Sequence, residues 1–267
     1  MVVVYLGYVL LGLFAGVAAG LLGVGGGLVI VPVLAWLYAW QGFPDGVLMQ
    51  LAVGTSLATI VATSLSSIRA HHLRGGVVWR LVVELGMGIL AGAWLGALLA
   101  HRMSSPSLAT LFGVFELLVA AQMAFGRPPP ARRAVPRTVV NAIAGVVVGT
   151  VSAVLGIGGG TLTVPWLVWH NLPMRQAVGT SAACGFPIAL AGMAGFVSTG
   201  WELSGLPAGS SGYVYWPAAV AVSIASVLAA PSGARLAHVL PQAVLKRVFA
   251  GFIGVLGVLM LGWQPLG

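Results

Sequence analysis

Long, predominantly apolar runs constrain this chain more than any other feature. Val77–Ala100 and Leu108–Phe125 are two of several such runs along the sequence. Each is long enough, as a helix, to cross the roughly 30 Å hydrocarbon core of a bilayer. Charged residues make up only 6% of the chain, against about 25% in soluble domains, so the chain cannot cover a soluble surface. We therefore predict an all-α polytopic membrane protein.

The basic residues are scattered between these runs. Lys and Arg number 12 against 4 Asp and Glu, which gives a formal net charge of +8. Scattered cations between apolar runs are typical of the positive-inside pattern, and since they form no basic face we predict no nucleic-acid partner. A single cysteine excludes an internal disulfide framework. The histidines do not cluster with carboxylates or thiols, so we predict no metal site and no cofactor.

Three blocks of sequence occur twice, in the same order. GVGGGLVIVP at Gly23–Pro32 matches GIGGGTLTVP at Gly156–Pro165, 133 positions later. AVGTS at Ala52–Ser56 recurs unchanged at Ala177–Ser181, 125 positions later, and the block around Trp79 recurs 137 positions later. These matches predict a duplicated chain.

The polar, proline-rich stretch GRPPPARRAVPR near mid-chain is the predicted linker between the two copies. We divide the chain into a first membrane repeat at 1–126, a cytoplasmic linker at 127–137 and a second membrane repeat at 138–267. Each repeat has one long apolar segment that contains the glycines, followed by three ordinary spans. The predicted segments are 3–40, 47–68, 77–100 and 108–126, then 138–170, 176–198, 214–234 and 245–264.

The basic residues also decide between two topologies. If each long segment crosses the membrane once, seven basic residues lie on one side of the membrane and five on the other. If each long segment returns to its starting side, eleven basic residues lie on one side and only Arg102 lies on the other. The positive-inside rule prefers the second arrangement. Both termini then face outward, the first segment is a retained span, and the two halves are inverted-topology repeats, an architecture of many secondary transporters.

The two glycine motifs give each long segment a place to turn, because glycine tolerates positive φ. The arm after each turn, Leu28–Trp40 or Thr161–His170, is then a partial helix too short to span. Pro32 and Pro165 lie near the start of these arms, where a missing N–H costs least. A helix broken in this way offers N–H groups and the positive end of its dipole to an anion. The alternative is that the glycines serve only tight helix packing.

The repeated AVGTS motif adds hydroxyl groups to this expected site. These hydroxyls donate either to an anion or to the backbone of their own helix. Cys184 follows the second motif and has either a role in transport or sulfur handling, or one in inert packing. The expected substrate-binding residues are Gly23, Gly25, Gly26, Gly27, Thr55, Ser56, Gly156, Gly158, Gly159, Gly160, Thr180, Ser181 and Cys184.

Two acidic residues fall inside predicted spans. Glu116 lies in the middle of 108–126, where a carboxylate is costly and functional by default, so it is our proton-coupling candidate. The alternative is a protonated carboxyl that hydrogen-bonds between helices. Glu84 lies one turn after Arg80, a spacing that predicts a local ion pair.

The doubled GxGGGxxxxP motif, followed in each half by AVGTS, resembles the sulfite exporter TauE/SafE family of membrane permeases. The resemblance extends over nearly the whole chain, including its duplication and its polar linker. It implies transport of small sulfur-containing anions such as sulfite, thiosulfate or organosulfonates across the cell (inner) membrane. The implied partners are a small anionic substrate and the lipid bilayer.

The residues leave other functions open: a passive anion channel, a carrier of a different small solute, or an intramembrane serine protease. The protease needs a serine within hydrogen-bond reach of a histidine. Ser56 and Ser181 lie in predicted spans, whereas the histidines lie at span ends, so we predict that the protein is not an enzyme.

Overall fold

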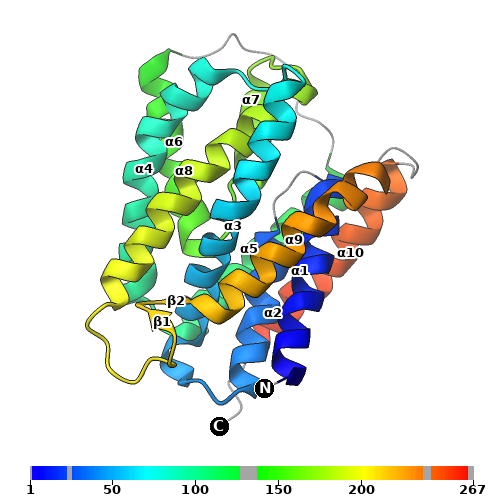
Figure 1. The fold of residues 1–267 in the computed structure, drawn as a ribbon. Coiled ribbons are helices and arrows are strands. Elements are labelled where there is room, and N and C mark those ends of the chain that lie inside the picture. Colours follow the sequence, from blue (N-terminus) through cyan, green and yellow to red (C-terminus); the bar gives the residue numbers. More distant parts are fainter. Residues whose placement is uncertain (1, 23–25, 127–136, 237–241, 264–267) are drawn as a thin grey trace.

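The computed structural model describes residues 2–22, 26–126, 137–236 and 242–263 (Figure 1). Over these ranges the chain is almost entirely helical. In chain order the elements are α1 (Val2–Leu22), α2 (Gly27–Trp40), the 3₁₀ turn η1 (Asp45–Val47), α3 (Leu48–Leu73), α4 (Trp79–Arg102), α5 (Ser105–Phe125), α6 (Thr138–Leu155), α7 (Gly160–Trp169), α8 (Met174–Gly200), β1 (Ser210–Ser211), β2 (Val214–Tyr215), α9 (Trp216–Leu236) and α10 (Gln242–Leu261).

The prediction of an all-α polytopic membrane protein is confirmed. Six of the described helices are long and apolar enough to span a membrane. Large apolar side chains such as Leu90 and Leu98 on α4 and Ile224 and Leu228 on α9 are exposed on the outside of the bundle. Such a surface suits contact with lipid tails rather than water.

A short hairpin before α9 was not expected from the sequence. Ser210–Ser211 pairs antiparallel with Val214–Tyr215. Strands of two residues are too short to show an alternating pattern, so periodicity could not have indicated them. The hairpin matters because it places the backbone of Tyr213 and Tyr215 against α3.

Both long apolar segments contain a second helix that is too short to span, as predicted. α2 has 14 residues and α7 has 10, or about 21 and 15 Å at 1.5 Å per residue. Gly156 ends α6 in the left-handed conformation (φ 66°), with Ile157 N–H bonded to Ser152 O as in a Schellman motif. Gly159 is also left-handed (φ 73°) and precedes α7. The GIGGG motif is therefore a turn, and residues 23–25 of GVGGG lie outside the described residues.

The two prolines of these arms do not lie where a missing N–H costs least, so that expectation is wrong. Pro32 and Pro165 are each the sixth residue of their helix, inside α2 and α7. Only the first four N–H groups of a helix lack an intrahelical partner, so each proline removes one helical hydrogen bond. The carbonyls that lose this bond belong to Leu28 and Thr161.

The two halves of the chain interlock through small-residue faces. α4 packs along α6, and α1 packs along α9. A Cβ on Gly92 of α4 would lie 2.1 Å from Val146 O, and one on Gly16 of α1 would lie 2.3 Å from Ser226 O. Each pair therefore joins a helix of residues 1–126 to a helix of residues 138–267 at a distance that only glycine permits.

Helices that match in the two halves pack against each other and run in opposite directions. Gly54, near the start of α3, lies against Phe196, near the end of α8. In the second matched pair, Gly113 of α5 lies against Met260 of α10, and Ala120 lies against Gly254. In Figure 1, α3 lies between the group α4, α6, α7, α8 and the group α1, α2, α9, α10. Antiparallel matched helices are what inverted repeats require. The linker at 127–136 lies outside the described residues, so the domain division stays a prediction.

Candidate functional site

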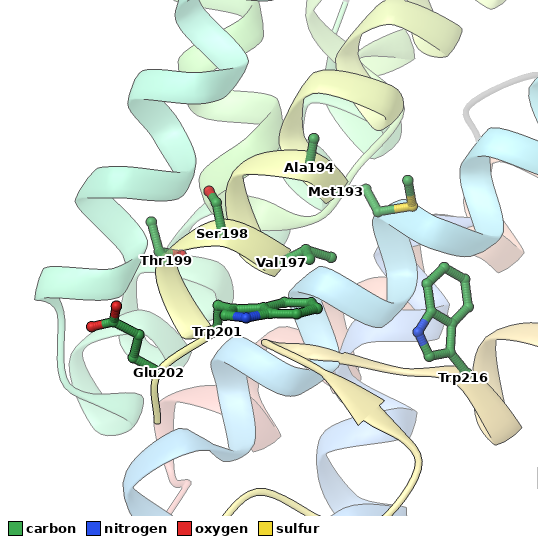
Figure 2. A pocket seen from close by; sticks show the side chains of 8 residues that line it. All are labelled: Met193, Ala194, Val197, Ser198, Thr199, Trp201, Glu202 and Trp216. Atoms are coloured by element: carbon green, nitrogen blue, oxygen red, sulfur yellow. The ribbon is translucent and has the colours of Figure 1, made fainter. Parts of the chain in front are cut away.

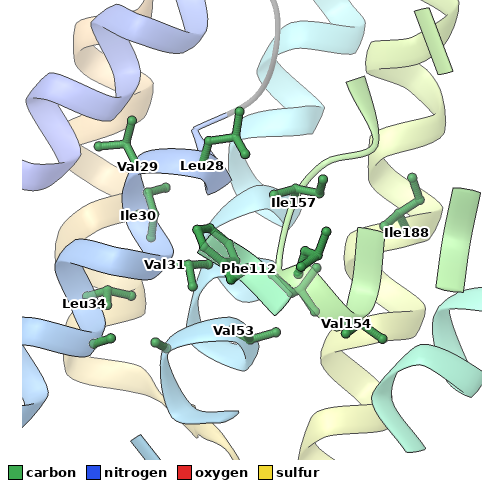
Figure 3. Close-up of a cluster of buried hydrophobic side chains, with 14 of the residues drawn as sticks. Leu28, Val29, Ile30, Val31, Leu34, Val53, Phe112, Val154, Ile157 and Ile188 are labelled. Atoms are coloured by element: carbon green, nitrogen blue, oxygen red, sulfur yellow. The ribbon is translucent and has the colours of Figure 1, made fainter. Parts of the chain in front are cut away.

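The described parts of the two glycine motifs meet in the centre of the protein. A Cβ on Gly27, the first residue of α2, would lie 2.5 Å from Gly156 O and 2.8 Å from Ile157 Cα. Figure 3 shows Leu28 at the start of α2 facing Ile157 of the second turn. Gly27 therefore contacts the GIGGG turn, whereas Gly26 lies against Ala15 of α1 and Ile30 of α2, and Gly23 and Gly25 lie outside the described residues.

The first AVGTS motif holds the second glycine turn. Ser56 Oγ donates a hydrogen bond of 2.8 Å to Gly156 O, and both residues are buried. A Cβ on Gly156 would lie 3.1 Å from Val53 Cα of the same motif. In this structure the Ser56 hydroxyl therefore donates to the backbone of the turn, and its role in anion binding stays a prediction.

The two motif threonines form matched contacts away from the turns. Tyr215 N–H donates to Thr55 Oγ1, and Val78 N–H donates to Thr180 Oγ1, each at 3.0 Å. Thr55 and Thr180 are 125 positions apart, and Val78 and Tyr215 are 137 apart, the offsets of the repeated blocks. Each hydroxyl therefore caps the segment that leads into a helix of the other half. The hydrogen bonds of the two threonine hydroxyls are therefore made with Tyr215 and Val78, and not with a residue of a glycine turn.

α8 lies against the second turn. Gly185 would place a Cβ 3.1 Å from Gly158 O, and its neighbour Cys184 is fully buried. Ser181, one turn earlier, is also buried, and its Oγ has no hydrogen-bond partner among the described residues. Cys184 and Ser181 are thus close in sequence to the contact between α8 and the turn.

Two buried hydroxyls beside the second turn were missed by the sequence analysis. Ser152 Oγ and Thr163 Oγ1 lie 3.3 and 3.5 Å from the point where a Cβ on Gly159 would be. Both side chains are fully buried, and neither hydroxyl has a partner among the described residues. Their positions just before and just after GIGGG were the available signal, but serine and threonine in apolar helices commonly bond to their own backbone.

The second turn also offers backbone donors. Leu162 and Thr163 N–H both bond to Gly159 O, whereas the N–H groups of Gly160 and Thr161 have no acceptor within α7 because they lie in its first turn. The positive end of the α7 dipole lies at the same place. The turn thus combines N–H and O–H donors, a set suited to a ligand with several acceptor atoms.

Glu116 is buried in α5, where it packs against α10. A Cβ on Gly257 of α10 would lie 3.1 Å from Glu116 Cβ. The side chain is fully buried, and neither carboxylate oxygen has a partner among the described residues. Phe112, one turn earlier on α5, lies beside Val31 of α2 in Figure 3. Glu116 is therefore on the face of α5 that points to the interior, not toward lipid.

The predicted ion pair of Glu84 is confirmed and belongs to a larger network. Arg80 Nε donates to one Glu84 oxygen at 2.8 Å, and Asn141 Nδ2 donates to the other at 2.6 Å. Trp166 Nε1 then donates to Asn141 Oδ1 at 3.4 Å. The network joins α4, α6 and α7, so it fixes the short helix α7 to the two full-length helices beside it.

A separate cavity of about 720 Å³ lies where α8 ends and α9 begins (Figure 2). Its walls include the indoles of Trp201 and Trp216, which are 67% and 40% exposed. The lining residues are Met193, Ala194, Val197, Ser198, Thr199, Trp201, Glu202 and Trp216. None of them belongs to the glycine turns, so this cavity is distinct from the predicted site.

Comparison with known proteins places the chain in a family. Residues 8–260 match the family model described as sulfite exporter TauE/SafE. The chain belongs to this family. It is 35% identical over 252 residues to a probable membrane transporter protein of Haemophilus influenzae, an alignment that covers 94% of this chain and 96% of the relative. It is 28% identical over 261 residues to the probable membrane transporter protein MJ0441 of Methanocaldococcus jannaschii, with 95% and 94% covered.

A third relative, the probable membrane transporter protein YunE of Bacillus subtilis, is 34% identical over 210 residues, which cover 71% of this chain and 76% of the relative. No solved structure matches the chain. The family and the apolar helices together identify a multi-pass membrane transporter rather than an enzyme.

Proposed function

We propose that this protein is a secondary transporter that moves small sulfur-containing anions, such as sulfite, thiosulfate or organosulfonates, across the cytoplasmic membrane together with protons. The observation that carries this proposal is the meeting of Gly27 with the GIGGG turn in the protein interior. Buried O–H donors and the first N–H groups of α7 lie at the same turn. Such donors replace the water lost by an anion, and they act more strongly in a low-dielectric interior.

The topology we propose places the two halves in the membrane as inverted repeats with both termini outside. The eleven-to-one split of basic residues and the antiparallel packing of matched helices support it. In this arrangement α3 and α8 enter the membrane from opposite faces, and Thr55 and Thr180 each lie in the first third of their helix. Access to the central site alternates as the Tyr215–Thr55 contact and the Val78–Thr180 contact open in turn.

Glu116 is the group we propose to carry the proton. A buried carboxylate without a hydrogen-bond donor is costly in its charged form and is relieved by protonation. Taking up a proton when the anion binds, and releasing it when the anion leaves, reduces the net charge that crosses the membrane. The location of Glu116 on the inner face of α5 supports this role.

Flux measurements on the purified full chain in liposomes test the proposal. We expect saturable movement of sulfite or thiosulfate that accelerates when a pH gradient is imposed in the coupled direction. Liposomes without protein are the control. Flux that neither saturates nor responds to the gradient would identify a passive channel instead, and no flux of any sulfur anion would overturn the proposal.

A further inference from the structure

The two hairpins that form the centre of the protein differ in one respect that their shared glycine motif conceals. Positions 133 residues apart carry Thr163 in the second hairpin and Ile30 in the first, and likewise Thr161 and Leu28. Ile30 and Leu28 are almost completely buried, and Figure 3 shows both aliphatic side chains at the start of α2. Only the second hairpin has side-chain hydrogen-bond donors at these positions.

The third matched position shows the same difference. Ser152 of α6 corresponds to Ala19 of α1. Ser152 Oγ and Thr163 Oγ1 lie on two helices beside Gly159, 3.3 and 3.5 Å from where a Cβ on that glycine would be, a point that Ile188 Cδ1 approaches more closely still. Both hydroxyls are fully buried without a partner among the described residues, so each lacks the acceptor that buried donors normally have.

We propose that the transported anion binds on the second hairpin alone, with its oxygens held by Ser152, Thr163 and the first N–H groups of α7, while α2 forms an apolar wall. This inference rests on the proposed function and names its binding residues. The ligand chemistry follows from the donor set. Hydroxyl and amide N–H groups at one turn suit an acceptor with several oxygens, such as the SO₃ group of sulfite or of a sulfonate, because an amide N–H can only donate.

The serines of the two AVGTS motifs are not part of the proposed binding set. Ser56 already donates to Gly156 O. Ser181 Oγ is buried without a partner among the described residues, but it lies on α8 and not on the second hairpin. The proposal therefore rests on Ser152 and Thr163, one on each arm of that hairpin.

Anion binding to the purified full chain in detergent tests the proposal, with sulfite and thiosulfate as the probes and protection against thermal unfolding as the readout. Ser152→Ala and Thr163→Val should each raise the half-saturating anion concentration about tenfold or more, the usual effect of losing a hydrogen bond to a charged group. Thr163→Ser, which keeps the hydroxyl, should restore binding.

A matched control separates binding from structure. Thr150→Val removes a hydroxyl of α6, the helix of Ser152, that is bonded to Val146 O at 2.8 Å. This change should leave the half-saturating concentration unchanged.

Each outcome decides the proposal. If the wild type binds sulfite or thiosulfate and Thr163→Val binds equally well, the one-sided site is wrong while the proposed function stands. If Thr150→Val weakens binding as much as Thr163→Val does, the loss comes from a general change in structure and the assignment of Thr163 is wrong. If the wild type binds neither anion, the proposed function and this site both fail.

Discussion

The backbone of the second glycine turn makes a sharp prediction, because neighbouring glycines differ in what they require. Gly156 has φ 66°, and a Cβ there would lie 2.9 Å from Val31 Cγ2 and 3.1 Å from Val53 Cα. Gly158 does not have a positive φ, and a Cβ there would meet only Ile60 Cγ2, at 3.5 Å. Alanine at these two positions therefore tests the turn itself.

The expected magnitudes follow from the geometry. Left-handed backbone costs an L-residue about 1–2 kcal/mol, and forcing a methyl group into a packed site adds about 1–3 kcal/mol. Gly156→Ala should thus destabilise the fold by about 2–5 kcal/mol, and Gly158→Ala by less than about 1 kcal/mol. In a chain of this size the first change should lower the melting temperature by about 5 °C or more.

The assay is thermal unfolding in detergent, with anion flux in liposomes measured in parallel. Gly156→Ala should lose stability and flux together, because the turn also carries the Ser56 contact. Gly158→Ala should retain the stability of the wild type. Equal melting temperatures for the two variants would refute the assignment of positive φ to Gly156 and, with it, the structure of the turn.

Three other predictions concern proton coupling, topology and the contacts between the halves. Glu116→Gln should keep anion binding but make flux independent of an imposed pH gradient; a gradient response like that of the wild type would remove Glu116 from the coupling step. A membrane-impermeant maleimide should label the Asp45→Cys variant from outside the cell, and the Met174→Cys variant only after permeabilisation. The wild type is the unlabelled control, because its one cysteine, Cys184, is fully buried. Labelling of both variants from the same side would exclude the inverted topology. Thr55→Val and Thr180→Val should each lower the melting temperature, because a buried N–H that loses its acceptor costs about 1–3 kcal/mol; Thr59→Val, whose hydroxyl bonds to Ser56 O in its own helix, should cost less.

The features predicted from sequence are those that depend on local composition. The lengths of the apolar runs gave the spans, because burial in lipid requires an apolar helix of a certain length. The glycines gave the break in the second hairpin, and α7 begins at Gly160, one residue before the predicted arm. Pro165 misled us because it is the fifth residue even of the predicted arm Thr161–His170, just past the first four N–H groups that lack an intrahelical partner.

The features that were missed depend on contacts between distant segments. Thr55 and Thr180 were expected at the turns, yet their partners, Tyr215 and Val78, belong to the other half of the chain. Ser152 was indistinguishable from a back-bonded helix serine until its position beside Gly159 was known. One-dimensional periodicity contains no information about such pairs, so a single sequence could not have identified them.

The reciprocal caps also bear on how the chain arose. Thr55 caps a segment from residues 138–267, and Thr180 caps one from residues 1–126. One half by itself would leave these acceptors, and the glycine faces of α1 and α4, without their partners. If the halves are inverted repeats as we propose, a single-repeat ancestor could have completed the same contacts with a second copy of itself in the opposite membrane orientation. Gene fusion would then have joined a pair that already assembled as a dimer of opposite orientations.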